Sequence, residues 1–139
     1  MSDLSQSKKG RILIVEDDWL LATELENQLR ELGYEIAAKA SSGEDALSSA
    51  TSTMPDVVIM DIRLGGKIKG TEAALWLTER FHLPIIFLTA YADADTLSAA
   101  RASHPHALIA KPHHASELNF AVQLALDSRK VTVLTRAKD

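Results

Sequence analysis

The stretch DVVIMDIRLGG, from Asp56 to Gly66, decides the fold of this chain. Four apolar residues, Val57 to Met60, lead directly onto a carboxylate, Asp61, and a loop with two adjacent glycines follows. A continuous apolar run rich in β-branched residues is typical of a strand buried on both faces of a parallel sheet. Because an isolated charge at the end of such a strand resists burial, Asp61 is expected to have partners close by.

Similar short apolar runs recur along the chain and alternate with helical patterns. The other runs are RILIV at 11–15, EIAAKA at 35–40, PIIFL at 84–88 and ALIA at 107–110. In EIAAKA, Glu35 and Lys39 alternate with small apolar residues, which favours a strand at the edge of the sheet. Alternation of strand and helix, five times over, predicts a doubly wound α/β domain with right-handed crossovers.

The segments between the runs have the spacing of amphipathic helices. Between Trp19 and Leu32, one stripe holds Leu21, Leu25, Leu29 and Leu32, and Gly33 is a natural stop. Shorter helices are expected at 43–50, 71–81, 92–103 and 116–128. The helix at 92–103 has Leu97 as its single large apolar residue, so its packing against the core is expected to be weak. In the last helix, one face carries Leu118, Ala121, Val122, Ala125 and Leu126.

Length and composition indicate one globular domain. The chain has 139 residues, is 46% hydrophobic and 24% charged, and contains no cysteine, which excludes disulfides and thiolate metal sites. A net charge of -4 argues against a nucleic-acid-binding surface. Without a signal peptide or an apolar run long enough to span a bilayer, the protein is expected to be cytoplasmic, with no membrane contact. We expect a tail at 1–10, the domain at 11–128 and a second tail at 129–139.

Charged and hydroxyl side chains follow the strands, where the binding site of an open α/β sheet is expected. They are Glu16, Asp17, Asp18, Asp61, Thr89 and Lys111. Asp18 stands just before a helix, so its main role is expected to be that of a helix cap. The remaining acids would repel one another unless a cation joined them, and hard oxygen ligands with room for water suit Mg²⁺. A lysine and a hydroxyl beside that cation are suited to a phosphoryl group.

The motifs ILIVEDD, DVVIMDIRL, IIFLTAYAD and LIAKP, in this order and spacing, resemble the receiver domain of two-component response regulators over about residues 11–128. The resemblance implies a flavodoxin-like five-stranded parallel sheet in the order 2-1-3-4-5, with helices on both faces. It also implies a signalling domain that catalyses only its own phosphorylation and dephosphorylation. Its partners would be a sensor histidine kinase or phosphotransfer protein and a downstream protein target, with a homodimer left open.

The same resemblance implies a role for each site residue. Asp61 would accept the phosphoryl group from a phosphohistidine. Glu16 and Asp17 would hold Mg²⁺ together with Asp61 and the backbone carbonyl of Arg63. Thr89 would donate a hydrogen bond to a phosphoryl oxygen, and Lys111 would pair with the phosphoryl charge. The Lys111–Pro112 peptide bond would be cis.

The chain departs from the family pattern around the switch. Leu108 occupies a position that is usually aromatic, which puts an aromatic-rotamer switch in doubt. The loop after Asp61 is one residue longer than is familiar and is rich in glycine. Arg63 and Tyr91 would border the path of the water that hydrolyses the aspartyl phosphate.

Two large apolar side chains, Phe120 and Leu124, point away from the apolar face of the last helix. Either the tail at 131–134 folds back over them, or they form a surface that binds a partner. The histidines that flank the last strand have no diagnostic metal-ligand spacing and are expected at the surface. They are His104, His106, His113 and His114.

Three alternative functions remain. A pseudo-receiver would bind a partner without phosphotransfer, but the five site residues argue against it. In a flavodoxin-like electron carrier, the acids after the first strand would repel the flavin phosphate. A phosphatase with an Asp nucleophile of the DxD type would lack its general acid, because the second position is Arg63.

Overall fold

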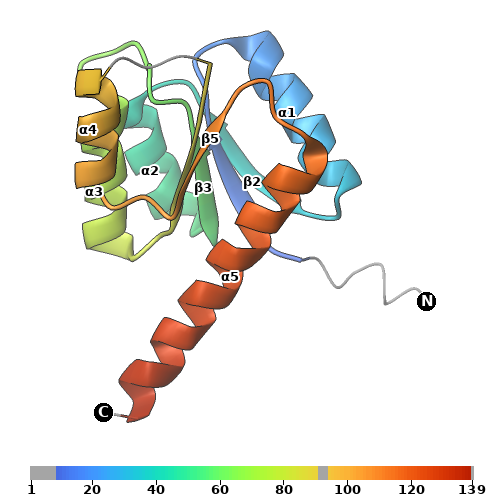
Figure 1. The fold of residues 1–139 in the computed structure, drawn as a ribbon, viewed down its shortest axis with the longest axis vertical. Coiled ribbons are helices and arrows are strands. Elements are labelled where there is room, and N and C mark those ends of the chain that lie inside the picture. The colour runs from blue at the N-terminus through green and yellow to red at the C-terminus, as the bar shows by residue number, and fades with distance from the viewer. Residues whose placement is uncertain (1–8, 91–93, 139) are drawn as a thin grey trace.

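The computed structural model describes residues 9–90 and 94–138, with side chains as far as Ser128. Within these ranges the chain forms a parallel five-stranded sheet in the order β2-β1-β3-β4-β5. The strands are β1 (Arg11–Val15), β2 (Glu35–Ala40), β3 (Val57–Met60), β4 (Ile85–Thr89) and β5 (Ala107–Ala110). The helices are α1 (Trp19–Glu31), α2 (Gly43–Thr53), α3 (Gly70–Phe81), α4 (Ala94–Ala102) and α5 (Ala115–Lys138) (Figure 1). The flavodoxin-like architecture and strand order are therefore confirmed, with EIAAKA as the edge strand β2.

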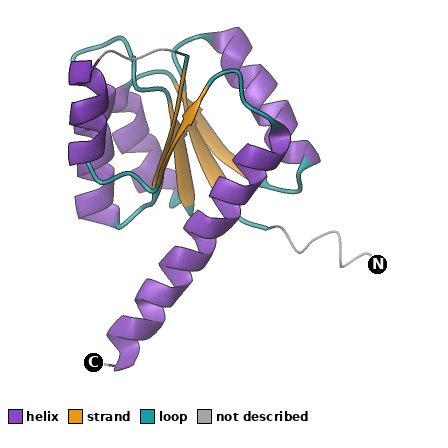
Figure 2. Cartoon of the chain, in the orientation of Figure 1, coloured by secondary structure: helices purple, strands orange, loops and turns teal. Residues whose placement is uncertain are grey.

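Helices cover both faces of the sheet (Figure 2). Ile12 and Ile14 of β1 pack toward α1 and α5, whereas Leu13 and Val15 pack toward α2, α3 and α4. Successive side chains of a strand point to opposite faces, so a strand covered on both faces needs an apolar residue at every position. This requirement explains the continuous apolar runs in β1, β3 and β4.

Helix α1 begins and ends where the sequence predicts. The carboxylate of Asp18 accepts hydrogen bonds from the backbone N–H groups of Leu20 and Leu21, and Gly33 has a φ of 102°. The expected cap is therefore confirmed. The predicted apolar stripe is wrong at its first position, because Leu21 is 39% exposed and Ala22 is buried instead. Leu21 lies in the first turn of the helix.

Helices α4 and α5 differ in how firmly they are packed. Ala100 is the one buried residue of α4, and Leu97, its single large apolar side chain, is only partly buried, so the expected weak packing of this helix is confirmed. The predicted apolar face of α5 is confirmed, and Phe120 and Leu124 are 65% and 45% exposed. Helix α5 continues without a break from Ala115 to Lys138 and projects beyond the sheet, so the segment at 131–134 does not fold back (Figure 1). The expected division at 128/129 therefore lies inside a helix.

The described part of the chain contains no helix that is both long and apolar enough to span a lipid bilayer.

Gly70, the first residue of α3, lies against the end of β3. A Cβ atom at this position would be 2.6 Å from the carbonyl oxygen of Ile62 and 3.0 Å from that of Asp61. Both are backbone atoms, so neither can swing aside as a flexible side chain would. Glycine therefore allows α3 to begin directly beside the residue that ends the central strand.

We predict that Gly70→Ala lowers the free energy of unfolding by about 1–3 kcal/mol, because the added methyl group overpacks against the backbone. Urea denaturation measures this change. Gly65→Ala is the matched control: its Cβ would lie 3.6 Å from Asp17 Oδ2, an ordinary contact, so stability should stay within about 0.5 kcal/mol of the wild type. Equal stability of the two variants would contradict the close approach at Gly70.

Candidate functional site

The carboxyl ends of four strands bring the candidate residues to one edge of the sheet. Asp61 follows β3, and its backbone N–H donates to the carbonyl of Val15 at the end of β1, at 3.0 Å. Lys111 follows β5, and its backbone N–H donates to the carbonyl of Thr89 at the end of β4, at 2.8 Å. Since these bonds continue the sheet by one residue, the side chains that follow β1, β3 and β5 face the same region.

Lys111 joins two of the acids. Its Nζ lies 3.5 Å from Oε1 of Glu16 and 3.5 Å from Oδ2 of Asp61. The side chains of Glu16, Asp61 and Lys111 are only 7%, 15% and 20% exposed. Charges this far from bulk water interact more strongly than surface charges, so the three groups are electrostatically coupled. The peptide bond between Lys111 and Pro112 is cis.

Glu16 is the most buried of the acids. Burial raises the pKa of its carboxyl group above the ordinary value, and the negative charge of Asp61 adds to the rise. The backbone N–H of Asp18, which donates to Glu16 Oε2 at 3.0 Å, and the charge of Lys111 act in the opposite direction. The balance remains upward, so the ammonium group and the backbone N–H do not fully offset burial and the neighbouring negative charge.

Asp17 differs from Glu16 in being exposed. Its Oδ2 accepts a hydrogen bond of 3.3 Å from the backbone N–H of Gly65, in the loop that follows β3. In the same loop, the backbone N–H of Arg63 donates to Oδ1 of Asp61 at 2.9 Å, and the Arg63 side chain is exposed. The loop therefore lies against two of the three candidate carboxylate ligands, Asp17 and Asp61.

The other predicted residues differ in their burial. Thr89 is buried, with 6% of its surface exposed, at the end of β4. Leu108, in β5, is 39% exposed, and Phe120 and Leu124 are exposed on α5. Tyr91 lies outside the described residues. His104 and His114 are exposed, as expected, whereas His106 and His113 are partly buried.

The donor set suits Mg²⁺, although the side chains do not form a closed ligand cage. Among residues 9–90 and 94–138, no group of three or more His, Asp or Glu side chains is close enough to hold a metal ion. Mg²⁺ keeps several of its waters and needs only one or two carboxylates, so a closed cage is not required. The raised pKa of Glu16 indicates negative charge that a cation would stabilise. The residues present therefore fit this ion.

A groove of about 500 Å³ beside the site was not predicted from the sequence. Its walls include Glu16, Leu21, Leu88, Lys111 and Pro112. Nε2 of His113, on the same wall, is 2.6 Å from Oε1 of Gln28 in α1. Burial lowers the pKa of His113, which favours the neutral imidazole. From the sequence, only His113 stands out, as an unusual residue after Lys111–Pro112. The role of Gln28 could not be predicted, because its partner His113 is 85 residues away along the chain.

Comparisons with known proteins agree with this architecture. The family model described as the response regulator receiver domain matches residues 12–123. The chain is 35% identical over 134 residues to the transcriptional regulatory protein PdtaR of Mycobacterium tuberculosis, an alignment that covers 96% of this chain and 65% of PdtaR. It is 30% identical over 125 residues to the phyllosphere-induced regulator PhyR of Methylorubrum extorquens, covering 89% of this chain and 46% of PhyR.

Among solved structures, the signal receiver domain of a modulated diguanylate cyclase from Desulfovibrio desulfuricans G20 superposes with a TM-score of 0.85 at 36% identity. That alignment covers 88% of this chain and 98% of the receiver domain. The chain thus spans about half to two thirds of the two curated relatives, but nearly all of this receiver domain.

We predict that the stability of the metal-free protein, relative to Glu16→Gln, falls as the pH rises above about 4. A carboxyl whose pKa is raised by folding binds its proton more tightly in the folded state, so its favourable contribution is complete at low pH. It is lost as the pH passes from the ordinary carboxyl pKa to the raised one. Urea denaturation in EDTA at several pH values measures the difference. Glu79→Gln, at an exposed position, is the control; a pH-independent difference for Glu16→Gln would contradict the prediction.

Proposed function

The chain belongs to the response regulator receiver domain family, and from that premise we propose that it is a phosphorylation-driven signalling switch. Asp61 accepts a phosphoryl group from the phosphohistidine of a sensor histidine kinase or phosphotransfer protein in a Mg²⁺-dependent reaction. The observation that most directly supports this proposal is the pairing of Asp61 and Glu16 with one lysine at a partly buried sheet edge.

In the proposed reaction, a carboxylate oxygen of Asp61 attacks the phosphorus atom. A P–O bond forms while the P–N bond to the donor imidazole breaks, and the imidazole takes up a proton as it leaves. Two hydrogen bonds hold the nucleophile in place: the backbone N–H of Asp61 donates to the Val15 carbonyl, and Asp61 Oδ1 accepts the backbone N–H of Arg63. Oδ1 already accepts the N–H of Arg63, whereas Oδ2 faces Lys111 Nζ, so we assign Oδ2 as the attacking atom.

The remaining roles follow from charge and position. Glu16, Asp17, Asp61 and the Arg63 carbonyl would hold Mg²⁺, which would supply positive charge to the carboxylates and the phosphoryl oxygens. The Lys111 ammonium group would move from Asp61 Oδ2 to the phosphoryl group. The hydroxyl of Thr89 would donate a hydrogen bond to a phosphoryl oxygen, since it ends the strand beside β3.

The proposed output is a change in packing that a cytoplasmic protein target detects. Helix α4 has little buried surface, and weakly packed elements are the ones that rearrange most readily. The exposed apolar side chains Leu108, Phe120 and Leu124 are assigned to contacts with that target, or with a second copy of the chain. The change around these side chains would proceed without an aromatic residue at position 108. Tyr91 is assigned to cover the phosphoryl group.

The competing function is a pseudo-receiver that binds its partner without phosphotransfer. The full set of nucleophile, acids, hydroxyl and lysine favours the phosphorylated switch, and labelling experiments decide between the two.

We predict that Asp61→Asn abolishes labelling by phosphoramidate or by a cognate kinase, because the amide keeps the shape of the side chain but is not a nucleophile. The wild type should take up close to one phosphoryl group per chain, measured by intact-protein mass spectrometry. Asp127→Asn, an exposed aspartate of α5, should be labelled like the wild type. Stoichiometric labelling of Asp61→Asn would rule out the assignment.

Asp17 and Asp18 are adjacent, but we predict different effects for their substitution by alanine: one on labelling and the other on stability. Asp17→Ala should reduce Mg²⁺-dependent labelling by at least about tenfold, because it removes a charged ligand. Asp18→Ala removes the cap of α1 and should lower the free energy of unfolding by about 1 kcal/mol while labelling continues. Labelling rates at several Mg²⁺ concentrations, together with urea denaturation, separate the two effects. A wild-type rate for Asp17→Ala would exclude it as a metal ligand.

A further inference from the structure

Alternate backbone N–H groups of the β3–α3 loop each donate to a different carboxylate. Arg63 donates to Asp61 Oδ1 at 2.9 Å, and Gly65 donates to Asp17 Oδ2 at 3.3 Å. Farther along the loop, Lys67 donates to Glu44 Oε2 at 3.1 Å, and Lys69 donates to Glu72 Oε1 at 3.0 Å. The loop is thus held through its main chain by acids from four different parts of the fold.

The four carboxylates fall into two pairs. Asp61 and Asp17 belong to the proposed site, so a bound cation would compete with the loop N–H groups for their carboxylate oxygens. Glu44 and Glu72 are the other pair, in the first turns of α2 and α3. Glu72 lies only three residues after Lys69 and caps its own helix, so Glu44 is the long-range anchor for the middle of the loop.

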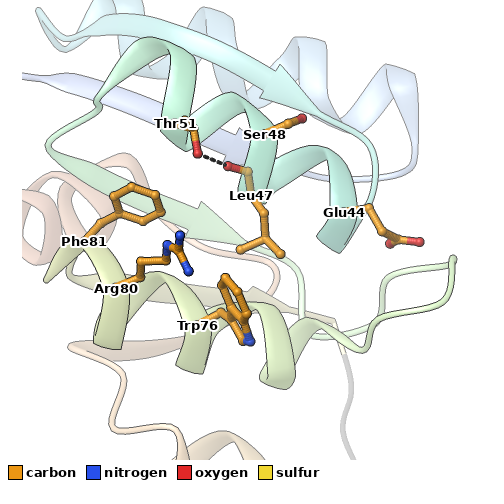
Figure 3. A pocket seen from close by; sticks show the side chains of 7 residues that line it. All are labelled: Glu44, Leu47, Ser48, Thr51, Trp76, Arg80 and Phe81. Atoms are coloured by element: carbon orange, nitrogen blue, oxygen red, sulfur yellow. Dashed lines mark hydrogen bonds between the residues drawn. The ribbon is translucent and has the colours of Figure 1, made fainter.

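The fold around Glu44 is built for close contact with this loop. Gly66 has a φ of 102°, and a Cβ there would lie 3.0 Å from Glu44 Oε1. A Cβ on Gly43 would lie 3.1 Å from the carbonyl oxygen of Ile68. Glycine on both sides therefore allows the start of α2 to approach the loop backbone. Glu44 also borders a second groove, which lies between α2 and α3 and is lined by Leu47 and Trp76 among others. Figure 3 shows the Glu44 carboxylate pointing away from Leu47 and from the rest of this groove.

The carboxylate of Glu44 is suited to hold the loop whether or not a cation is bound. The backbone N–H groups of Glu44 itself and of Lys67 lower its pKa, so it remains a strong acceptor at neutral pH. The hydrogen bond of Gly65 to Asp17, at 3.3 Å, is longer than that of Lys67 to Glu44, at 3.1 Å. The Gly65 bond also ends on a carboxylate that the proposed cation would engage, whereas the Lys67 bond ends on Glu44, outside the site.

We propose that Glu44 is a positioning residue that keeps the β3–α3 loop in place as Asp17 engages the cation, and thereby sets the affinity of the site for Mg²⁺. The inference rests on the proposed function, in which the Arg63 carbonyl of this loop is a metal ligand. Without Glu44, the loop is less ordered before Mg²⁺ binds, so binding must also order the loop. The affinity for Mg²⁺ therefore falls, while the chemistry at Asp61 is unchanged.

The test compares the full-length wild type with Glu44→Ala, Glu44→Gln and the exposed control Glu79→Ala. Amide hydrogen exchange in EDTA reports on the loop, amide NMR shifts during a Mg²⁺ titration give the dissociation constant, and phosphoramidate labelling gives the maximal rate. Glu44→Ala should speed exchange at Lys67 and raise the Mg²⁺ dissociation constant about threefold to tenfold, with a maximal labelling rate within about twofold of the wild type. Glu44→Gln keeps an oxygen acceptor and should restore most of the affinity, and Glu79→Ala should match the wild type.

Two results would overturn the proposal. One is unchanged loop exchange and Mg²⁺ affinity in Glu44→Ala. The other is lower thermal stability of Glu44→Ala with an unchanged dissociation constant, which would give Glu44 a purely structural role. A wild type that binds Mg²⁺ but is not labelled would refute phosphorylation, whereas exchange and titration would still decide the role of Glu44.

Discussion

The ammonium group of Lys111 lies between two carboxylates at an edge of the sheet where little water reaches them. Glu16 and Asp61 would repel each other strongly there, and the raised pKa of Glu16 shows that one lysine does not fully offset the burial and the neighbouring charge. Lys111 therefore offsets part of the charge of the two carboxylates, and a cation at this edge of the sheet would offset more of it. Both effects depend on the sheet, which holds the ends of β1, β3 and β5 at one edge.

Rigidity is distributed unevenly around this group. Asp61 ends a strand whose four residues are all buried, whereas α4 contributes one buried alanine and the loop after Asp61 is held by hydrogen bonds to carboxylates. A nucleophile benefits from a fixed position, because its orientation is then set before the donor arrives. The surrounding elements can rearrange at low cost, since few apolar contacts must be broken. The architecture thus combines a firmly held Asp61, the proposed nucleophile, with a weakly packed α4.

Much of the fold could be predicted because its signals are local. The apolar runs mark the strands, the spacing of apolar residues marks the buried face of α5, and Asp18 marks the start of α1. The predictions were wrong where a local pattern of residues carries no information about the neighbouring elements. Leu21 fits the helical stripe but is 39% exposed in the first turn of α1, and α5 continues past the end that its amphipathic pattern suggested. The site residues were recognised as a motif set, and their chemical roles stay predictions.

The sequence by itself determined the strand ends, and with them the set of acids, hydroxyl and lysine that a parallel sheet must bring to one edge. Only the tertiary structure decided which groups contact one another: Lys111 with Glu16 and Asp61, Gln28 with His113, and Glu44 with the backbone of Lys67. These partners are separated by 23 to 95 residues along the chain. Their contacts depend on how closely helices and loops approach across the core, and no local pattern of residues encodes that distance.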